Sequence, residues 1–456
     1  MPPRALALAT GPTAWAWMLV ALTACGQSAA EVPPAAPAPS AVVPASATSP
    51  AQARTSPPPA PATTQDSPAT IHGELAVVQG QRVLRVWGTP TQMGHAHGFL
   101  LRDSILEIVD GYALDVIPPT ALATAASLYT TIADISPRLR EETEGIIAVM
   151  KQAGGARVPG LDRDLQASDL LVLNAMTDLL AIGCSSVSAW GPSTADAPQL
   201  AGAPALVRNL DWSEDPQLLG NQVIIVYRPD DPKRQPVVSV AFAGYVGCLS
   251  CMNEAGVSAL FNMGYGEGAA GLSTALAGFS PSNLLLRDAL EQRDIDGDGR
   301  STADDVEALW RRKTHAGSYI LHLIEPRRSD VDTPARVLEV EADGVVRRDP
   351  DAEGALGPQM LAATNHLRRK TEPSSCSRYR RVERTVTKAE HQFDRDSLWA
   401  LGSTLRLPQV VHAVLVEPEA RALQVWLRKP SETDDATSSP VAHTWSSLVG
   451  TPGAAP

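Results

Sequence analysis

The spacing of hydrophobic residues changes character once along the chain, close to Cys184. Before that point, apolar side chains recur every three or four positions, as they do from Leu170 to Leu180, and this period predicts amphipathic helices. Beyond it, short apolar runs bounded by Pro, Asp and Gly predict strands. The helices expected before Cys184 cover about 91–114, 119–133, 137–152 and 167–182.

Strands are expected on both sides of this helical region. Two alternating segments, 74–78 and 82–87, flank a Gln-Gly-Gln turn ahead of the first helix. Because the later strands follow one another in hairpin order and the later helices are grouped, the pattern indicates an α+β fold of sheets layered with helices. The later strands are expected at 184–190, 204–209, 221–228, 236–243, 246–251, 256–262, 319–325, 336–342, 359–364, 411–417 and 422–428, and the later helical stretches at 281–315, 377–389 and 396–403.

Both ends of the chain differ from this folded part. Residues 14–24 form a short apolar stretch typical of an export signal, and Leu22-Thr23-Ala24-Cys25 resembles a bacterial lipoprotein box. That resemblance implies a signal peptide over 1–24, a lipid on Cys25 and an exported, membrane-anchored bacterial protein; an ordinary secretory signal is the alternative. Residues 25–70 are rich in Ala, Pro, Ser and Thr, which predicts a flexible tether. Residues 431–456 predict a flexible tail in which Trp445 and Leu448 could dock.

Charge and cysteine content narrow the functional classes. The chain has 456 residues and a formal charge of −12, whereas general nucleic-acid binding needs a basic face. Among its five cysteines, Cys248 and Cys251 form a Cys-x-x-Cys pair and Cys376 stands apart. No thioredoxin-like βαβ pattern surrounds the pair, so two small buried cysteines are expected there in preference to a redox motif.

Gly183-Cys184 is the candidate for chemistry. A cysteine that opens a strand directly after a glycine suits an N-terminal nucleophile, which cuts the peptide bond before itself and then uses its freed α-amine as a base. Arg208 and Asp211 follow on the next expected strand, where an arginine can lower the pKa of a thiol and a carboxylate can orient an amine. Their spacing places them on opposite faces of a regular strand, so the strand is expected to end or twist at Asp211. A structural Arg–Asp salt bridge beside a buried cysteine is the alternative.

Several short segments, in the same order, add a family resemblance. Cys184-Ser185-Ser186 followed by Arg208-Asn209-Leu210-Asp211-Trp212 is similar to the N-terminal-nucleophile (Ntn) hydrolases of the choloylglycine hydrolase and acyl-CoA:6-aminopenicillanate acyltransferase (peptidase C45) groups. The resemblance implies a four-layer αββα sandwich, an oxyanion hole that includes Asn253 and Asn365, and an Arg378 that supports the nucleophile. Val257 and Leu367 depart from the family pattern. The further matching segments are Gly88 to Gly98, Met252-Asn253-Glu254, Thr364-Asn365-His366 and Ser377-Arg378-Tyr379.

The same resemblance implies an organisation and an activity. Residues 71–183 would be a helical pro-segment or small subunit, and 184–430 the catalytic region, with the two pieces associated after cleavage between Gly183 and Cys184. The expected activity is hydrolysis of a linear amide bond in a small-molecule or peptide N-acyl substrate, with no cofactor for catalysis. An acyltransferase that uses an amine acceptor is the first alternative, and a catalytically inactive lipid-anchored binding protein is the second.

A separate acidic segment, inserted at about 290–312, fits a calcium loop. Oxygen ligands fall at its positions 1, 3 and 5, glycine at 6, a backbone carbonyl at 7 and a carboxylate at 12, and helices are expected on both sides. This spacing predicts a structural Ca²⁺ site; an acidic, solvated turn is the alternative. The expected ligands are Asp294, Asp296, Asp298, the carbonyl of Arg300, and Asp305.

Overall fold

The computed structural model describes residues 70–178, 183–265, 278–369, 376–431 and 439–450. The predicted signal peptide, Cys25 and the predicted tether lie outside these ranges, apart from residue 70. Within the described part of the chain, no helix combines the length and the hydropathy that crossing a bilayer requires.

The larger of two main sheets has nine strands, and strands from both sides of Cys184 build it. Its order is β1-β2-β7-β8-β9-β10-β11-β12-β13, antiparallel except where β2 runs parallel to β7. The strands that precede Cys184 therefore lie at one edge of a sheet whose remaining strands follow it. The bounds are β1 Gly73–Val78, β2 Gln81–Gly88, β7 Gln222–Pro229, β8 Val237–Phe242, β9 Ser250–Asn253, β10 Ser258–Met263, β11 Tyr319–Ile324, β12 Ala335–Glu341 and β13 Gly344–Arg348.

The second sheet has six antiparallel strands in the order β14-β5-β6-β15-β16-β17. Its bounds are β5 Gly183–Ala189, β6 Ala205–Asp211, β14 Met360–Ala363, β15 Val410–Glu417, β16 Ala422–Leu427 and β17 Val441–Thr444. A two-stranded ribbon, β3 Arg157–Val158 with β4 Arg163–Asp164, lies apart from both sheets in the pairing.

Hydrophobic packing arranges these sheets in four layers. One core cluster joins Val240 and Leu260 of the large sheet to Leu206 and Val414 of the small sheet, so the two sheets face each other. A second cluster covers the other face of the large sheet with helices, and a third covers the other face of the small sheet with α12 and α13. The helices are α2 Pro90–Leu100, α3 Arg102–Ile108, α4 Leu114–Val116, α5 Pro119–Ile132, α6 Pro137–Gln152, α7 Ala167–Asn174, α8 Pro216–Gly220, α10 Ser282–Glu291, α11 Ala303–Arg311, α12 Ser377–Lys388, α13 Arg395–Ser403 and α14 Trp445–Val449.

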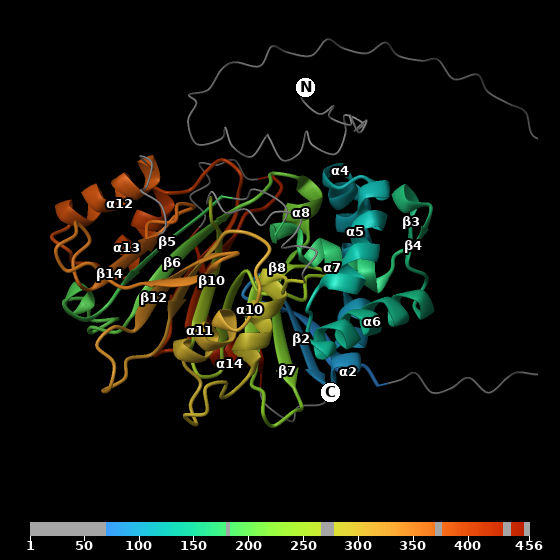
Figure 1. Ribbon diagram of the computed structural model, residues 1–456, viewed down its shortest axis with the longest axis horizontal. Coiled ribbons are helices and arrows are strands. Elements are labelled where there is room, and N and C mark those ends of the chain that lie inside the picture. The colour runs from blue at the N-terminus through green and yellow to red at the C-terminus, as the bar shows by residue number, and fades with distance from the viewer. Residues whose placement is uncertain (1–69, 179–182, 266–277, 370–375, 432–438, 451–456) are drawn as a thin grey trace, which may run out of the picture. The chain divides into compact units, whose positions relative to one another are not determined.

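This arrangement confirms the predicted α+β sandwich. In Figure 1, α12 and α13 lie on one side of the sheets and α5, α6 and α7 on the other. The expected long helix over 91–114 is divided into α2, α3 and a π-helical turn, Val109–Ala113. The final strand of the large sheet, β13, was not expected; it returns along β12 after a tight turn at Gly344, whose φ of +139° favours glycine.

The two strands expected before Cys184, at 74–78 and 82–87, are confirmed as β1 and β2, and both belong to the nine-stranded sheet. Without them the edge of β7 would be exposed, so residues from both sides of Cys184 complete one sheet. The tail is also ordered in part: β17 pairs with β16, and Leu448 of α14 is fully buried in the core between the sheets.

Candidate active site

Cys184 is the second residue of β5, and its thiol points into the space between the sheets. The side chain is fully buried. Its Sγ lies 3.4 Å from Nη2 of Arg208 on the neighbouring strand β6, and the same Nη2 donates to the carbonyl of Phe261 on β10, at 2.6 Å. The predicted nucleophile and its predicted arginine are therefore in contact, with one strand of the opposite sheet beside them.

Gly183, on the other side of the candidate scissile bond, pairs with Asp211 across β5 and β6. A Cβ on residue 183 would lie 3.1 Å from Cβ of Asp211, 3.3 Å from its Oδ2 and 3.1 Å from Cδ1 of Leu407. Because contacts this short require a neighbour to move, the position favours glycine. The carboxylate of Asp211 thus lies against the residue whose carbonyl Cys184 would attack.

A chain of hydrogen bonds reaches the backbone nitrogen of Cys184 from the α12 side. This N–H donates to Oδ1 of Asn365, at 3.2 Å, and Nη2 of Arg378 donates to the same oxygen, at 2.6 Å. Nη1 of Arg378 is 3.1 Å from Oδ2 of Asp211. Arg208 of β6 contacts the thiol, whereas Asp211 is linked to the backbone nitrogen of Cys184 only through Arg378 and Asn365.

Burial dominates the ionisation of these groups. Desolvation raises the pKa of the Cys184 thiol, and the charge of Asp211 raises it further; Arg208, Arg378 and the backbone N–H of Met263 oppose this shift. Desolvation also raises the pKa of Asp211 to about 6, although Arg378 and the N–H of Leu407 favour its charged form. Asp211 therefore changes charge just below neutral pH.

The structure does not bring Asn253 to this site, which corrects its expected role in the oxyanion hole. Nδ2 of Asn253 donates to the carbonyl of Leu290 and to Oγ of Ser301, and its Oδ1 accepts from the N–H of Val257. Leu290 belongs to α10, in the helical layer outside the large sheet. Asn253 therefore faces away from Cys184 and fastens β9 to the acidic loop.

Asn365 reaches Cys184, but as an acceptor for its backbone N–H. Its Nδ2 donates to the carbonyl of Met263, at 2.8 Å, so the amide of Asn365 joins the backbone of β5 to that of β10.

A second asparagine that the sequence analysis did not single out lies between the sheets. Nδ2 of Asn262 is 3.4 Å from both Oγ of Ser186 and the carbonyl of Thr364, and its buried Oδ1 has no hydrogen-bond partner among the described residues. Ser186 is two residues from Cys184 on the same face of β5. In the sequence, Asn262 is a polar residue inside the apolar run of β10, and this pattern could have identified it as a candidate site residue.

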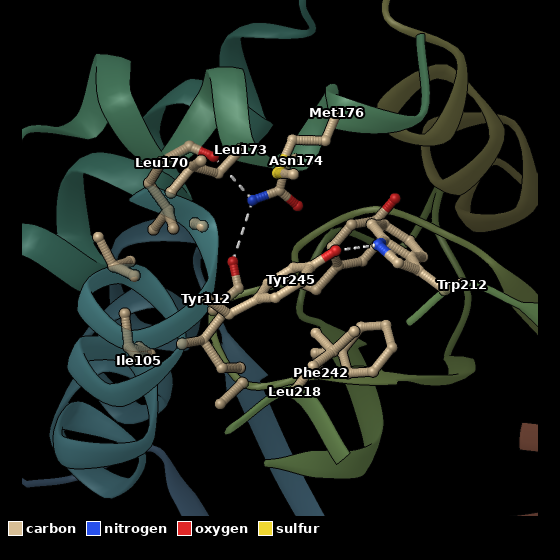
Figure 2. A pocket seen from close by; sticks show the side chains of 15 residues that line it. Ile105, Tyr112, Leu170, Leu173, Asn174, Met176, Trp212, Leu218, Phe242 and Tyr245 are labelled. Carbon is tan, nitrogen blue, oxygen red and sulfur yellow. Dashed lines mark hydrogen bonds between the residues drawn. The ribbon is translucent and has the colours of Figure 1, made fainter. Parts of the chain in front are cut away.

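An apolar pocket is lined by residues from both sides of Cys184 in the sequence, and one of them is Trp212, the residue after Asp211. Figure 2 shows Ile105, Leu170 and Leu173 on the helical side of the pocket, with Trp212 and Phe242 on the strand side. Nε1 of Trp212, the residue after Asp211, donates to the hydroxyl of Tyr112, at 2.6 Å. Polar groups are few in this lining, so the pocket suits an apolar group.

The two cysteines of the Cys-x-x-Cys pair are buried, as expected. Cys248 and Cys251 form a disulfide with each other. Cys376 is free and buried, at the residue before α12.

The acidic loop lies between α10 and α11, as expected. Carboxylate oxygens of Asp294, Asp296 and Asp305 lie within 4.8 Å of one another, a group that does not include Asp298. Gly299, at position 6, has a φ of +81°. Oxygen donors from these three residues fit a hard divalent cation.

Comparison with known proteins gives a limited likeness. No family model matches the chain. A curated relative, protein dcd1B of Dictyostelium discoideum, is 23% identical over 183 residues, which are 37% of this chain and 35% of the relative. The match thus spans about a third of that protein.

Among solved structures, the chain is similar to the N-acylethanolamine-hydrolyzing acid amidase ortholog of Caenorhabditis elegans, at 18% identity over 52% of this chain and 93% of that one, with a TM-score of 0.39. It is also similar to penicillin V acylase of Agrobacterium tumefaciens, at 12% identity, 54% and 83% coverage and a TM-score of 0.35. A mutant conjugated bile acid hydrolase of Clostridium perfringens gives 12% identity, 58% and 94% coverage and a TM-score of 0.33. At these values, the activity must be inferred from the residues around Cys184.

Proposed function

We propose that the chain is a self-cleaving amidohydrolase whose nucleophile is Cys184. The observation that carries this proposal is the contact of one residue pair, Gly183-Cys184, with groups distant in the sequence. Arg208 touches the thiol, Asn365 binds the backbone nitrogen, and Asp211 lies against Gly183. A buried structural cysteine would need neither an arginine at its sulfur nor a bonded side chain at its nitrogen.

Self-cleavage follows from this geometry in two steps. Sγ of Cys184 attacks the carbonyl carbon of Gly183, the C–N bond breaks, and the nitrogen leaves as an amine after taking up a proton, so that a thioester joins the two residues. Water then attacks the thioester, giving a carboxyl group on Gly183 and restoring the thiol. Asn365 already binds the nitrogen that becomes the amine, and Asp211 and Arg378 are in place to orient it.

The freed α-amine then acts as the base in turnover. The thiol attacks an amide carbonyl, the product amine leaves with a proton, and water releases the acid from the acyl-enzyme. The apolar pocket that includes Trp212 would receive an apolar part of the acyl group, since its lining also includes Leu173 and Phe242. The proposed substrate is an N-acyl amide with a small apolar acyl part.

Transfer of the acyl group to an amine is the second candidate, because the same thioester precedes both outcomes. The processed protein would be incubated with a panel of N-acyl amides, with and without an added amine. Release of free acid in both cases supports hydrolysis. Formation of a new amide, with acid release suppressed, would favour transfer. No turnover of any amide by a cleaved protein would contradict both and favour the binding protein.

The two asparagines give a paired prediction about the oxyanion. We propose that Asn262, and not Asn253, donates to it; Asn262→Ala is then expected to reduce turnover by on the order of 100-fold. Asn253→Ala is expected to lower the melting temperature while changing turnover little, because its bonds join β9 to α10 and Ser301. Steady-state rates and thermal melts of both variants test this. The reverse ranking of the two rates would contradict the assignment.

We also propose Ca²⁺ as a structural ion in the acidic loop, supported by the three clustered carboxylates. Calcium in excess over a chelator is expected to raise the melting temperature by a few degrees. Asp296→Asn should reduce that rise, whereas Asp330→Asn, an exposed acid paired with Arg300, should not. Equal melting in calcium and in chelator would contradict the proposal.

A further inference from the structure

Arg208 is a buried cation without a carboxylate partner. Its side chain is fully buried, and no carboxylate of the described residues lies within ion-pair distance of it. Asp211, the nearest acid in the sequence, is paired with Arg378 instead. A guanidinium removed from water in this way needs other partners, because burying an unpaired charge is strongly unfavourable.

Besides the carbonyl of Phe261, two neutral side chains act as such partners. Nη1 of Arg208 donates to Oγ of Ser250, at 2.7 Å, and lies 3.2 Å from Nε2 of His412. Oγ of Ser250 is 3.0 Å from the same Nε2. Since a guanidinium only donates, Nε2 must be an acceptor, and the hydroxyl accepts from Arg208 while donating to His412.

His412 is therefore uncharged, with its proton on Nδ1. That nitrogen is buried and has no hydrogen-bond partner among the described residues. Burial, together with the charge of Arg208, holds the pKa of His412 well below its usual range. A protonated His412 would place a second donor and a second positive charge against Arg208.

We propose that Ser250 and His412 are positioning residues that hold Arg208 against the Cys184 thiol without neutralising its charge. A carboxylate in their place would fix the guanidinium equally well, but it would cancel the field that stabilises a thiolate. This inference rests on the proposed function, because a reacting Cys184 thiolate is the reason for a neutral pair beside Arg208.

The backbone around both residues is constrained in a way that fits this role. Ser250 lies between Cys248 and Cys251, so their disulfide closes a short ring that contains it. The pairing of β15 with β6 shifts register between Val410 and His412, and such a bulge turns the side chains that follow. Each residue is thereby fixed by its own strand, one from each sheet.

The charged and titratable groups that face Cys184 come from three elements and one loop. They are Arg208 and Asp211 of β6, Arg378 of α12 and, through Arg208, His412 of β15 and Tyr245 after β8. Ser250→Ala and His412→Leu leave the charges of Arg208, Asp211 and Arg378 unchanged. A shift in the titration of Cys184 in these variants would therefore report the placement of Arg208.

The experiment is a titration of the Cys184 thiolate by its ultraviolet absorbance, after subtraction of the same protein carrying Cys184→Ala. Ser250→Ala and His412→Leu are expected to raise the thiol pKa by about one unit, which lowers the thiolate fraction about tenfold at a pH below that pKa. His412→Gln, whose amide oxygen can accept in place of Nε2, should titrate like the wild type. Ser250→Asp should raise the thiol pKa most, because it adds a carboxylate beside Arg208.

Ser188→Ala is the matched control. Ser188 bonds Nε2 of His322, at 2.8 Å, in a similar serine–histidine pair between the sheets that does not touch Arg208. If Cys184 titrates with the same midpoint pH in all variants, even in those with lower melting temperatures, the proposal is overturned. The titration needs no self-cleavage: a shifted titration in a chain that never cuts itself would support the positioning role while contradicting the proposed function.

Discussion

Replacing Cys184 with alanine is expected to leave a single uncut chain with no amidase activity. The alanine has no nucleophile for the Gly183 carbonyl, so neither the thioester nor the free α-amine forms. Denaturing gels of wild type and variant, with mass spectrometry of each band, measure the cut directly. The loss of cleavage should be complete because, among the described residues, no thiol other than that of Cys184 lies against Gly183.

Cys376→Ala provides the control for loss of a buried thiol. Cys376 is the other free cysteine among the described residues, and it has no part in the proposed reaction. This variant should cut itself as the wild type does. Cleavage of Cys184→Ala at an unchanged rate would remove Cys184 from the mechanism.

Asp211→Asn is expected to give the next largest effect, an uncut or very slowly cut chain that is no less stable than the wild type near pH 8. Asparagine keeps the size of the side chain but cannot carry the negative charge that orients an ammonium group. A loss on the order of 100-fold in cleavage rate is expected, comparable to the loss of one strong polar contact at a reacting centre.

The expected stability of Asp211→Asn follows from the pKa of Asp211, which burial raises from 3.8 to about 6. Between these values the folded chain binds more protons than the unfolded chain, so the contribution of Asp211 to stability falls as the pH rises through this window. Above about pH 6 the folded protein carries the full cost of the buried carboxylate, and asparagine avoids it. Thermal melts from pH 4 to pH 8 should show the wild type losing more stability than the variant.

Asp215→Asn is the matched control for this substitution. Asp215 caps α8 four residues further on, and asparagine is an equally good cap. It should leave cleavage unchanged. A wild-type rate of cleavage in Asp211→Asn, or a large loss in Asp215→Asn, would contradict the role given to Asp211.

Most strands and helices of the sandwich could be predicted from the sequence, because the period of an apolar run indicates whether it forms a strand or a helix. β5, β6 and β15 lie close to their expected positions, and their pairing brings Arg208 to Cys184. β17 could not be predicted in the same way. β17 has four residues, which pair with β16. Leu448, in the helix that follows, packs into the core between the two sheets.

Residues of the candidate site could be predicted where they belong to a recognisable motif. They could not be predicted where the pairing register of the strands decides which way a side chain points. Asn253 matched a short motif, but its strand directs it away from the thiol, toward α10. Ser250, three residues earlier, faces Arg208 across the space between the sheets. Ser250 and His412 belong to no motif, and only the pairing of separate strands shows what they hold.

The location of the cut in the wild-type protein tests the central claim most directly. Intact-mass analysis under denaturing conditions should show two pieces, the second beginning at Cys184, whose masses sum to the chain plus one water. Under native conditions the pieces should migrate together, because β1 and β2 lie in the same sheet as β7. A chain that remains whole, or a cut that leaves any residue other than Cys184 at the new N-terminus, would contradict the account.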